Sequence, residues 1–273
     1  MMSFEQIQVI RDGFVGRITL HRPAERNAMT PQMGREISRA VEQMNSDDNV
    51  RVVVITGSGK GFCSGADLRT LGAEAKSGEA SSDETSSVEA EEGLGGGENF
   101  YRAFLSIRDL RVPSIAAING HAVGAGFCFA LGADLRVMHT DAKVGMTFVR
   151  LGIHPGMAAT WTLPRLVGPA VAADLLYTGR LFGAQEALAL GVANRIAGDD
   201  FQAVVDEMAE QIASAAPLAV RETKQTLRGS GARTIDDALT REASVQAVTF
   251  TTADAAEGIQ AMREKRKASF VGR

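Results

Sequence analysis

Two segments of the chain share the same form: a short strand, then several small residues, then the start of a helix. One covers residues 61–68, and the other covers residues 119–126 and continues into an apolar helix. Small residues let a backbone approach a ligand closely, and the first N–H groups of a helix have no acceptor within it. Two such N–H groups from separate segments would form an oxyanion hole, which stabilises charge that develops in a transition state. Taken alone, each segment could equally be a tight strand-to-helix turn.

The apolar pattern predicts an α/β core followed by helices. Residues 7–20 indicate a hairpin, and residues 51–56 are an uninterrupted run typical of a strand covered by helices on both faces. Strand and helix patterns alternate to about residue 198, and only helical patterns follow. We therefore expect a core over residues 1–198 and a helical C-terminal region over residues 199–273.

Residues 73–98 interrupt this alternation. They are rich in Ser, Gly, Ala and Glu, have no apolar period, and contain eight acidic residues against one lysine. Such a segment cannot bury enough apolar surface to order itself. We predict a mobile acidic insertion, either disordered or acting as a lid.

Composition excludes several classes of protein. The net charge of −4 offers no electrostatic reason for a nucleic-acid or anionic-membrane partner. The start of the chain lacks a signal-peptide pattern, and no apolar run is long enough to span a membrane. Two cysteines without a CxxC motif, with four histidines, argue against a disulfide framework or a metal site. We expect a cytoplasmic protein without metal or cofactor.

A longer pattern surrounds the second glycine-rich turn. Residues 115–135 read IAAING, then GAG after three residues, then LGADL after four more. This pattern resembles the signature of the enoyl-CoA hydratase/isomerase (crotonase) family at every position. Further matches are LHRP and RNAM within residues 20–29, FCSGADL at 62–68, LGI and PG within 151–156, and EKRKASF at 264–270. The resemblance covers essentially the whole chain.

The resemblance implies a fold, an assembly and a substrate. The fold would be the ClpP/crotonase-like spiral of ββα units, with the C-terminal helices making the contacts of a homotrimer or hexamer. The substrate would be a coenzyme A thioester. Its carbonyl oxygen would accept from the backbone N–H groups of Ala66 and Ala125, where Ala125 replaces the more usual glycine but keeps the N–H.

The resemblance also implies which residues contact coenzyme A and the acyl group. They are Arg26, Ser64, Ala66, Asp67, Leu68, Gly124 and Phe148, and in the C-terminal region Lys267 and Phe270. The last two would reach the ligand of a neighbouring subunit. Residues 265–267 could equally be a solvated basic helix end, and Phe148 could line an acyl pocket or only pack against the core.

The chain departs from the family at the two glutamates that hydratases use as acid and base. Cys128 and Phe148 stand at those positions. Of the four acids between residues 99 and 185, Asp134 belongs to the signature and is expected to fix the end of a helix. His154 borders the expected acyl pocket and has the right pKa range for acid/base work, or it only hydrogen-bonds its loop.

Three functions fit this combination. The first is an acyl-CoA lyase or isomerase that moves protons through His154 or a carboxylate of the insertion. The second is an enolate-forming enzyme without a glutamate base, such as a decarboxylase of a malonyl-type thioester. The third is an acyl-CoA-binding protein without catalysis.

Overall fold

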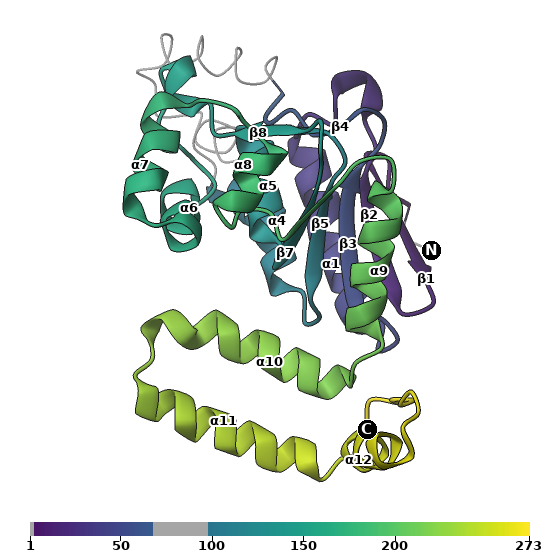
Figure 1. The fold of residues 1–273 in the computed structure, drawn as a ribbon. Coiled ribbons are helices and arrows are strands. Elements are labelled where there is room, and N and C mark those ends of the chain that lie inside the picture. The colour runs from purple at the N-terminus through teal and green to yellow at the C-terminus, as the bar shows by residue number, and fades with distance from the viewer. Residues whose placement is uncertain (1–2, 68–97) are drawn as a thin grey trace, which may run out of the picture.

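The chain folds around a large sheet, seen from its side in Figure 1. The computed structural model describes residues 3–67 and 98–273, so Leu68 and the predicted insertion, except Glu98, lie outside the described residues. In spatial order the strands are β1 (Ile7–Asp12), β2 (Val15–Leu20), β3 (Val52–Gly57), β5 (Ser114–Ile118), β7 (Leu135–His139) and β10 (Arg195–Ala197). β1 and β2 form the expected antiparallel hairpin, and the other neighbours are parallel.

A second, smaller sheet contains the strands that follow β3, β5 and β7 in the chain. Its order is β4 (Gly61–Cys63), β6 (His121–Val123), β8 (Lys143–Gly145) and β9 (Phe182–Gly183). The chain passes from β3 to β4, from β5 to β6 and from β7 to β8, so consecutive strands belong to different sheets and a helical segment follows each pair. This repeat confirms the expected spiral of ββα units.

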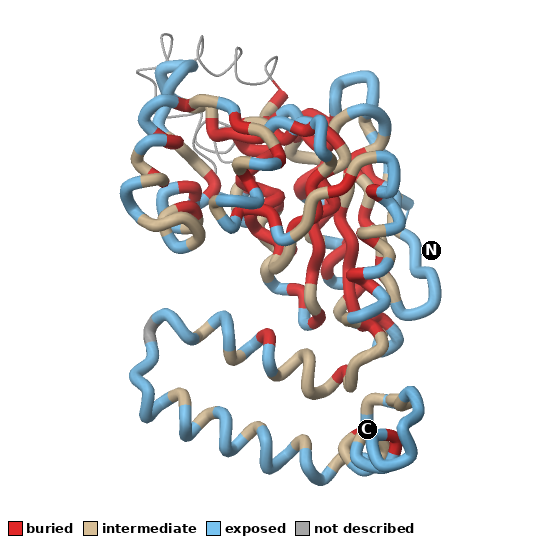
Figure 2. Tube along the Cα trace, viewed as in Figure 1, coloured by how far each residue is buried: buried red, intermediate tan, exposed pale blue. Residues whose placement is uncertain are grey.

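Both faces of the large sheet are buried, as the apolar run of β3 predicts. Val53 and Ile55 face one buried cluster, which includes residues of α1 (Pro31–Ser46), α4 (Glu98–Leu105) and α5 (Ala125–Gly132). Val52 and Val54 face the other, which α9 (Phe201–Ala213) covers. Figure 2 shows the buried residues concentrated along these strands. Three further helices, α6 (Ala159–Val167), α7 (Pro169–Thr178) and α8 (Ala184–Ala189), lie between β8 and β10 in the chain.

Helices alone follow β10 over residues 198–273, all of which are described. Beyond α9, the helices α10 (Pro217–Gly229), α11 (Ile235–Phe250) and α12 (Ala253–Glu264) extend away from the sheets (Figure 1). α11 buries none of its residues. Large apolar side chains are exposed along these three helices: Leu227, Ile235, Leu239, Val248, Phe250, Ile259 and Met262. A boundary at residue 198 stays a prediction, because α9 itself packs on the large sheet.

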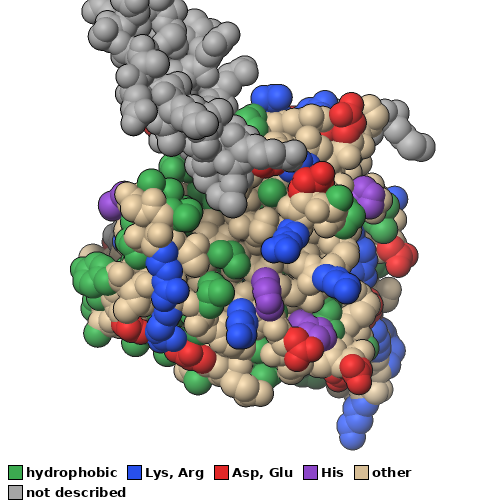
Figure 3. Space-filling view, turned by 90° about the horizontal axis from the view of Figure 1, so that it is seen from above, with side chains coloured by type: hydrophobic (Ala, Val, Ile, Leu, Met, Phe, Trp, Pro, Cys, Tyr) green, Lys and Arg blue, Asp and Glu red, His purple; other side chains and the backbone are tan. Residues whose placement is uncertain are grey.

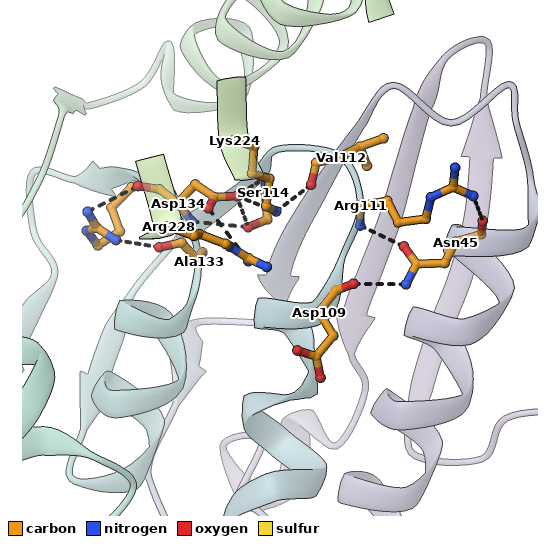
Figure 4. A network of polar contacts seen from close by, with 10 residues as sticks. Asn45, Asp109, Arg111, Val112, Ser114, Ala133, Asp134, Lys224 and Arg228 are labelled. Carbon is orange, nitrogen blue, oxygen red and sulfur yellow. Dashed lines mark hydrogen bonds and ion pairs between the residues drawn. The ribbon is translucent and has the colours of Figure 1, made fainter. Parts of the chain in front are cut away.

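A polar network fastens α10 to the core (Figure 4). The Asp134 carboxylate, just beyond α5, accepts from the Ser114 N–H and hydroxyl, both at 2.8 Å. The buried Lys224 ammonium of α10 lies 2.7 Å from the same carboxylate and donates to the Val112 carbonyl oxygen at 2.6 Å. Arg228 lies 3.8 Å from the other carboxylate oxygen. Asp134 therefore joins the chain just beyond α5 to the start of β5 and to α10, and its predicted role at the end of α5 stays a prediction.

Two kinds of feature, membrane-spanning helices and clusters of metal-binding side chains, are absent from the described parts of the chain. No helix among them is both long and apolar enough to cross a membrane. Nor does any group of three or more His, Cys, Asp or Glu side chains within residues 3–67 and 98–273 have an arrangement that could hold a metal ion.

Candidate active site at the start of α5

The two small-residue segments of the sequence meet in space. β4 and β6 are parallel neighbours, so the chain after Cys63 runs beside the chain after Val123. Gly65 adopts a φ of +96°, and a Cβ placed on it would lie 2.8 Å from the Val123 carbonyl oxygen and 3.6 Å from the Ala125 nitrogen. Only glycine permits both this backbone conformation and this approach. The loop that carries Ala66 therefore lies directly against the start of α5.

The hydrogen bonds that hold the backbone around Ala66 do not use the Ala66 N–H. Met29 pairs with this segment as in a parallel bridge. Its N–H donates to the Gly65 carbonyl oxygen at 2.8 Å, and its carbonyl oxygen accepts from the Asp67 N–H at 3.1 Å. Backbone groups alternate in direction along an extended segment, so the Ala66 N–H faces away from Met29. Among the described residues this N–H has no hydrogen-bond acceptor.

The first turn of α5 is fixed from two sides. The Gly124 N–H donates to the Gly145 carbonyl oxygen of β8 at 2.8 Å. A Cβ on Gly126 would lie 2.5 Å from the Cys63 carbonyl oxygen and 2.8 Å from its Sγ, so the helix start packs directly on Cys63 of β4. Ala125 is the first residue of α5, and its N–H likewise has no acceptor within the described chain. The two predicted donors thus come from segments in direct contact.

Asn27, which sequence reasoning passed over, ties the Arg26 loop to the β4 loop. Its side chain is fully buried, and its amide nitrogen donates to the carbonyl oxygens of Ser58, Gly61 and Phe62 at 2.9, 2.9 and 3.2 Å. Its amide oxygen accepts from the Arg22 N–H at 2.9 Å. The RNAM match was the only sequence signal at this position, because a single buried polar residue produces no periodic pattern in the sequence.

The structure brings together most of the predicted ligand contacts on this side of the molecule. Arg26 and Ser64 are exposed neighbours, since the Ser64 N–H donates to the Arg26 carbonyl oxygen at 3.1 Å. Asp67 is buried, with its carboxylate 3.6 Å from the Arg22 guanidinium. This pairing gives Asp67 a structural partner beside the loop of Ala66.

Basic side chains also gather on this side. Lys60 precedes β4, while His121 and Lys143 begin β6 and β8, and all three are exposed. Strand pairing makes them neighbours: Gly61 pairs with His121, whose Nδ1 accepts from the Lys143 N–H at 3.1 Å. Figure 3, which views the molecule from above, shows Lys, Arg and His side chains in the middle of this face. Such a surface suits a ligand that carries phosphates.

Comparison with known proteins gives this geometry its context. The family model described as enoyl-CoA hydratase/isomerase matches residues 11–273. The chain belongs to the enoyl-CoA hydratase/isomerase family. It is 35% identical to a crotonyl-CoA hydratase of Syntrophomonas wolfei over the full length of both, and 37% identical to a probable enoyl-CoA hydratase of Mycobacterium tuberculosis over 84% of each. The crystal structure of an enoyl-CoA hydratase subunit of Geobacillus kaustophilus is similar with a TM-score of 0.86, at 33% identity over 99% of each chain.

Neither Cys128 nor Phe148, which the resemblance predicts at the glutamate positions of the family, is ionised. Cys128 is buried on α5, and burial raises the pKa of its thiol to about 12, so it is neutral at physiological pH. Its Sγ lies 3.8 Å from the Gly156 carbonyl oxygen. Phe148 is half-buried and packs against the core. His154 is exposed, with Nδ1 2.8 Å from the carbonyl oxygen of the adjacent Pro155.

The four acidic residues between positions 99 and 185 are paired with basic side chains or exposed. Asp134 and Asp174 each pair with a basic side chain, at 2.7 and 2.8 Å. Asp109 and Asp141 are exposed. Each of the four is therefore solvated or engaged elsewhere.

Two predicted contacts lie far from this site within one chain. Lys267 is exposed at the C-terminus, with Nζ 3.8 Å from Glu210. The Phe270 carbonyl oxygen accepts from the Arg51 guanidinium at 2.7 Å. Figure 1 places this end of the chain opposite β4 and α5. If either residue contacts the ligand, it does so from a second copy of the chain.

Proposed function

We propose that the chain is an acyl-CoA enzyme that stabilises a thioester enolate between the N–H groups of Ala66 and Ala125. The observation that carries this proposal is the contact between the two segments, with the Ala125 nitrogen 3.6 Å from the position of a Gly65 Cβ. Both N–H groups lack an acceptor in the described chain. Backbone donors fixed in advance stabilise developing charge without reorganising during the reaction.

The same proposal excludes efficient hydration by the two-glutamate mechanism. Relatives of the chain are named hydratases, but a neutral thiol and a phenyl ring occupy the acid and base positions here. Each positioned acid or base contributes about 10²–10⁴-fold in rate. We therefore expect crotonyl-CoA hydration to be very slow, and enolate formation to use His154 or to follow loss of CO₂ from a malonyl-type ester.

We also propose that the chain assembles as a homotrimer or hexamer through α10, α11 and α12. The exposed apolar side chains of these helices support it, because monomeric proteins rarely leave so many on one region. Assembly would be the route by which Lys267 and Phe270 reach a neighbouring site. Light scattering measures the mass directly, and a monomer at micromolar concentration would contradict the proposal. A cytoplasmic location stays a prediction.

A panel of esters tests the chemistry. Turnover of crotonyl-CoA, a 3-enoyl-CoA and methylmalonyl-CoA is measured beside direct binding of each ester. Slow hydration with faster turnover of another ester is the expected result. Crotonyl-CoA hydration at a rate ordinary for hydratases would refute the enolate route without glutamates. Tight binding without turnover of any ester would favour the non-catalytic alternative.

Replacing Ala125 with proline tests the oxyanion donor itself. Proline is tolerated at the first position of a helix, where its only loss is the N–H. Turnover should fall by about 10²–10³-fold while ester binding changes much less. Ala184→Pro is a matched control, because Ala184 is also a buried first helical residue after a glycine, in α8. Unchanged turnover in Ala125→Pro, with the oligomeric state intact, would contradict the assignment.

A further inference from the structure

The proposed enolate needs a proton, and the described side chains at the expected positions do not supply one. Burial raises the pKa of the Cys128 thiol to about 12, which makes it a weaker acid than an ordinary phenol, whose pKa is about 10. Phe148 has no proton to give. Besides His154, a polar group from another element that the fold brings to the same place is a further source.

Helix α4 is oriented by aromatic packing against α5. The rings of Phe104 and Phe129 meet edge to face with centroids 5.8 Å apart, and Phe100 packs on Phe104 at 4.9 Å. Both α4 phenylalanines are buried. Tyr101 is half-buried beside them, with its ring 6.2 Å from that of Phe100. The packing of α4 therefore fixes the direction in which Tyr101 projects.

Tyr101 projects onto Gly156, the residue that Cys128 also contacts. A Cβ on Gly156 would lie 2.6 Å from the phenol oxygen and 2.9 Å from Cζ of Tyr101, so only glycine leaves room for the ring. The Gly156 carbonyl oxygen lies 3.8 Å from the Cys128 Sγ. Cys128 follows Ala125 by three residues, which places both on the same face of α5, one turn apart. The phenol of α4 and the thiol of α5 thus both lie against Gly156.

We propose that Tyr101 is a catalytic residue that delivers the proton to the thioester enolate; this assignment rests on the proposed function. The electron pair of the enolate takes the phenolic hydrogen: the O–H bond breaks, a C–H bond forms at the α-carbon, and the thioester carbonyl is restored. The resulting phenolate then takes a proton from water. No oxidant or further reactant is needed.

Tyr101→Phe tests this step, because phenylalanine keeps the ring against Gly156 and removes only the hydroxyl. With the panel ester that the parent protein turns over fastest, kcat should fall by about 10²–10⁴-fold while ester binding is unchanged. The chain has one other tyrosine, Tyr177, which is 80% exposed on α7. Tyr177→Phe is the matched control and should keep the parent kcat.

A reaction in D₂O separates catalysis from packing. With crotonyl-CoA or methylmalonyl-CoA as the substrate, the parent protein should place deuterium on one face of the product α-carbon, and the residual product of Tyr101→Phe should lose this facial preference. Parent-like kcat and stereochemistry in Tyr101→Phe would overturn the assignment and leave the proposed function standing. A parent protein that turns over none of the esters would overturn both.

Discussion

The substitution Lys224→Met measures how much burial of the Lys224 charge, which holds α10 on the core, lowers the free energy of unfolding. The Lys224 ammonium lies 2.7 Å from the Asp134 carboxylate and 2.6 Å from the Val112 carbonyl oxygen (Figure 4). Burial lowers the pKa of Lys224 to about 8, with Arg228 and Arg108 contributing and Asp134 opposing. The ammonium is therefore charged at pH 7, in a place that favours the neutral amine.

The sign of the pH dependence follows from proton binding. An unfolded lysine keeps a pKa near 10.5, so between pH 8 and 10.5 the unfolded chain binds more protons than the folded one. The free energy of unfolding therefore rises with pH across this window. At about 1.4 kcal/mol per pKa unit, the full rise amounts to about 3 kcal/mol, of which about 1 kcal/mol falls between pH 8 and 9.

The buried thiols act in the opposite direction at higher pH. Burial raises the pKa of Cys63 and Cys128 from 9.0 to about 12, so the stability that they contribute is lost as the pH rises above 9. The window from pH 8 to 9 is consequently the cleanest for Lys224. Subtracting the unfolding curve of Lys224→Met removes the thiol contribution, because the variant keeps both cysteines.

Urea unfolding of the parent and of Lys224→Met, at intervals from pH 7 to 10, provides the measurement. The difference in unfolding free energy, parent minus variant, should rise by about 1 kcal/mol from pH 8 to 9. Lys267→Met is the control, since Lys267 is 79% exposed and should give a flat difference. A flat difference for Lys224→Met as well would refute the idea that burial governs this lysine.

Two further changes test the geometry of the site. Gly65→Ala places a Cβ 2.8 Å from a carbonyl oxygen at a φ of +96°, so it should lower both turnover and melting temperature. Gly61→Ala is the control, because its Cβ would meet only one atom, at 3.8 Å, and it should leave both near the parent values. Equal effects of the two variants in enzyme assays and thermal melts would contradict the argument from close approach. Asn27→Asp replaces a buried amide, which donates to three carbonyl oxygens, with a carboxyl group. The free energy of unfolding in urea should fall by about 3–5 kcal/mol. A loss below about 1 kcal/mol would show that Asn27 does not tie the two loops.

The parts of the fold that the sequence predicts are those that depend on local pattern. The run from Val52 to Ile55 implies a strand with no solvent-facing side, and the structure divides its residues between two buried clusters. The small residues around Gly65 and Gly126 imply close backbone approach, and added Cβ atoms there would meet carbonyl oxygens at 2.8 and 2.5 Å. In both cases the residue types alone predict how the segment packs.

The parts that the sequence does not predict depend on contacts between distant elements. Lys224 lies in a helix whose polar pattern indicates a solvated side chain, and only the position of Asp134 across the fold explains its burial. Tyr101 follows the acidic segment, with no motif around it, and Gly156 meets it from 55 positions further along the chain. Periodicity describes one element at a time, so it gives no information on such pairs.

Backbone and side chains carry different parts of the proposed chemistry, and this separation bears on how the chain departs from its family. The proposed oxyanion donors are N–H groups positioned by Gly65, Gly126 and strand pairing, so they do not depend on the side chain at position 128 or 148. The predicted replacement of the two glutamates by Cys128 and Phe148 would change proton transfer and leave the proposed charge stabilisation in place. On this proposal a family member keeps enolate stabilisation while its proton source moves to another helix, and the phenol of Tyr101, which lies against Gly156, is the proposed source.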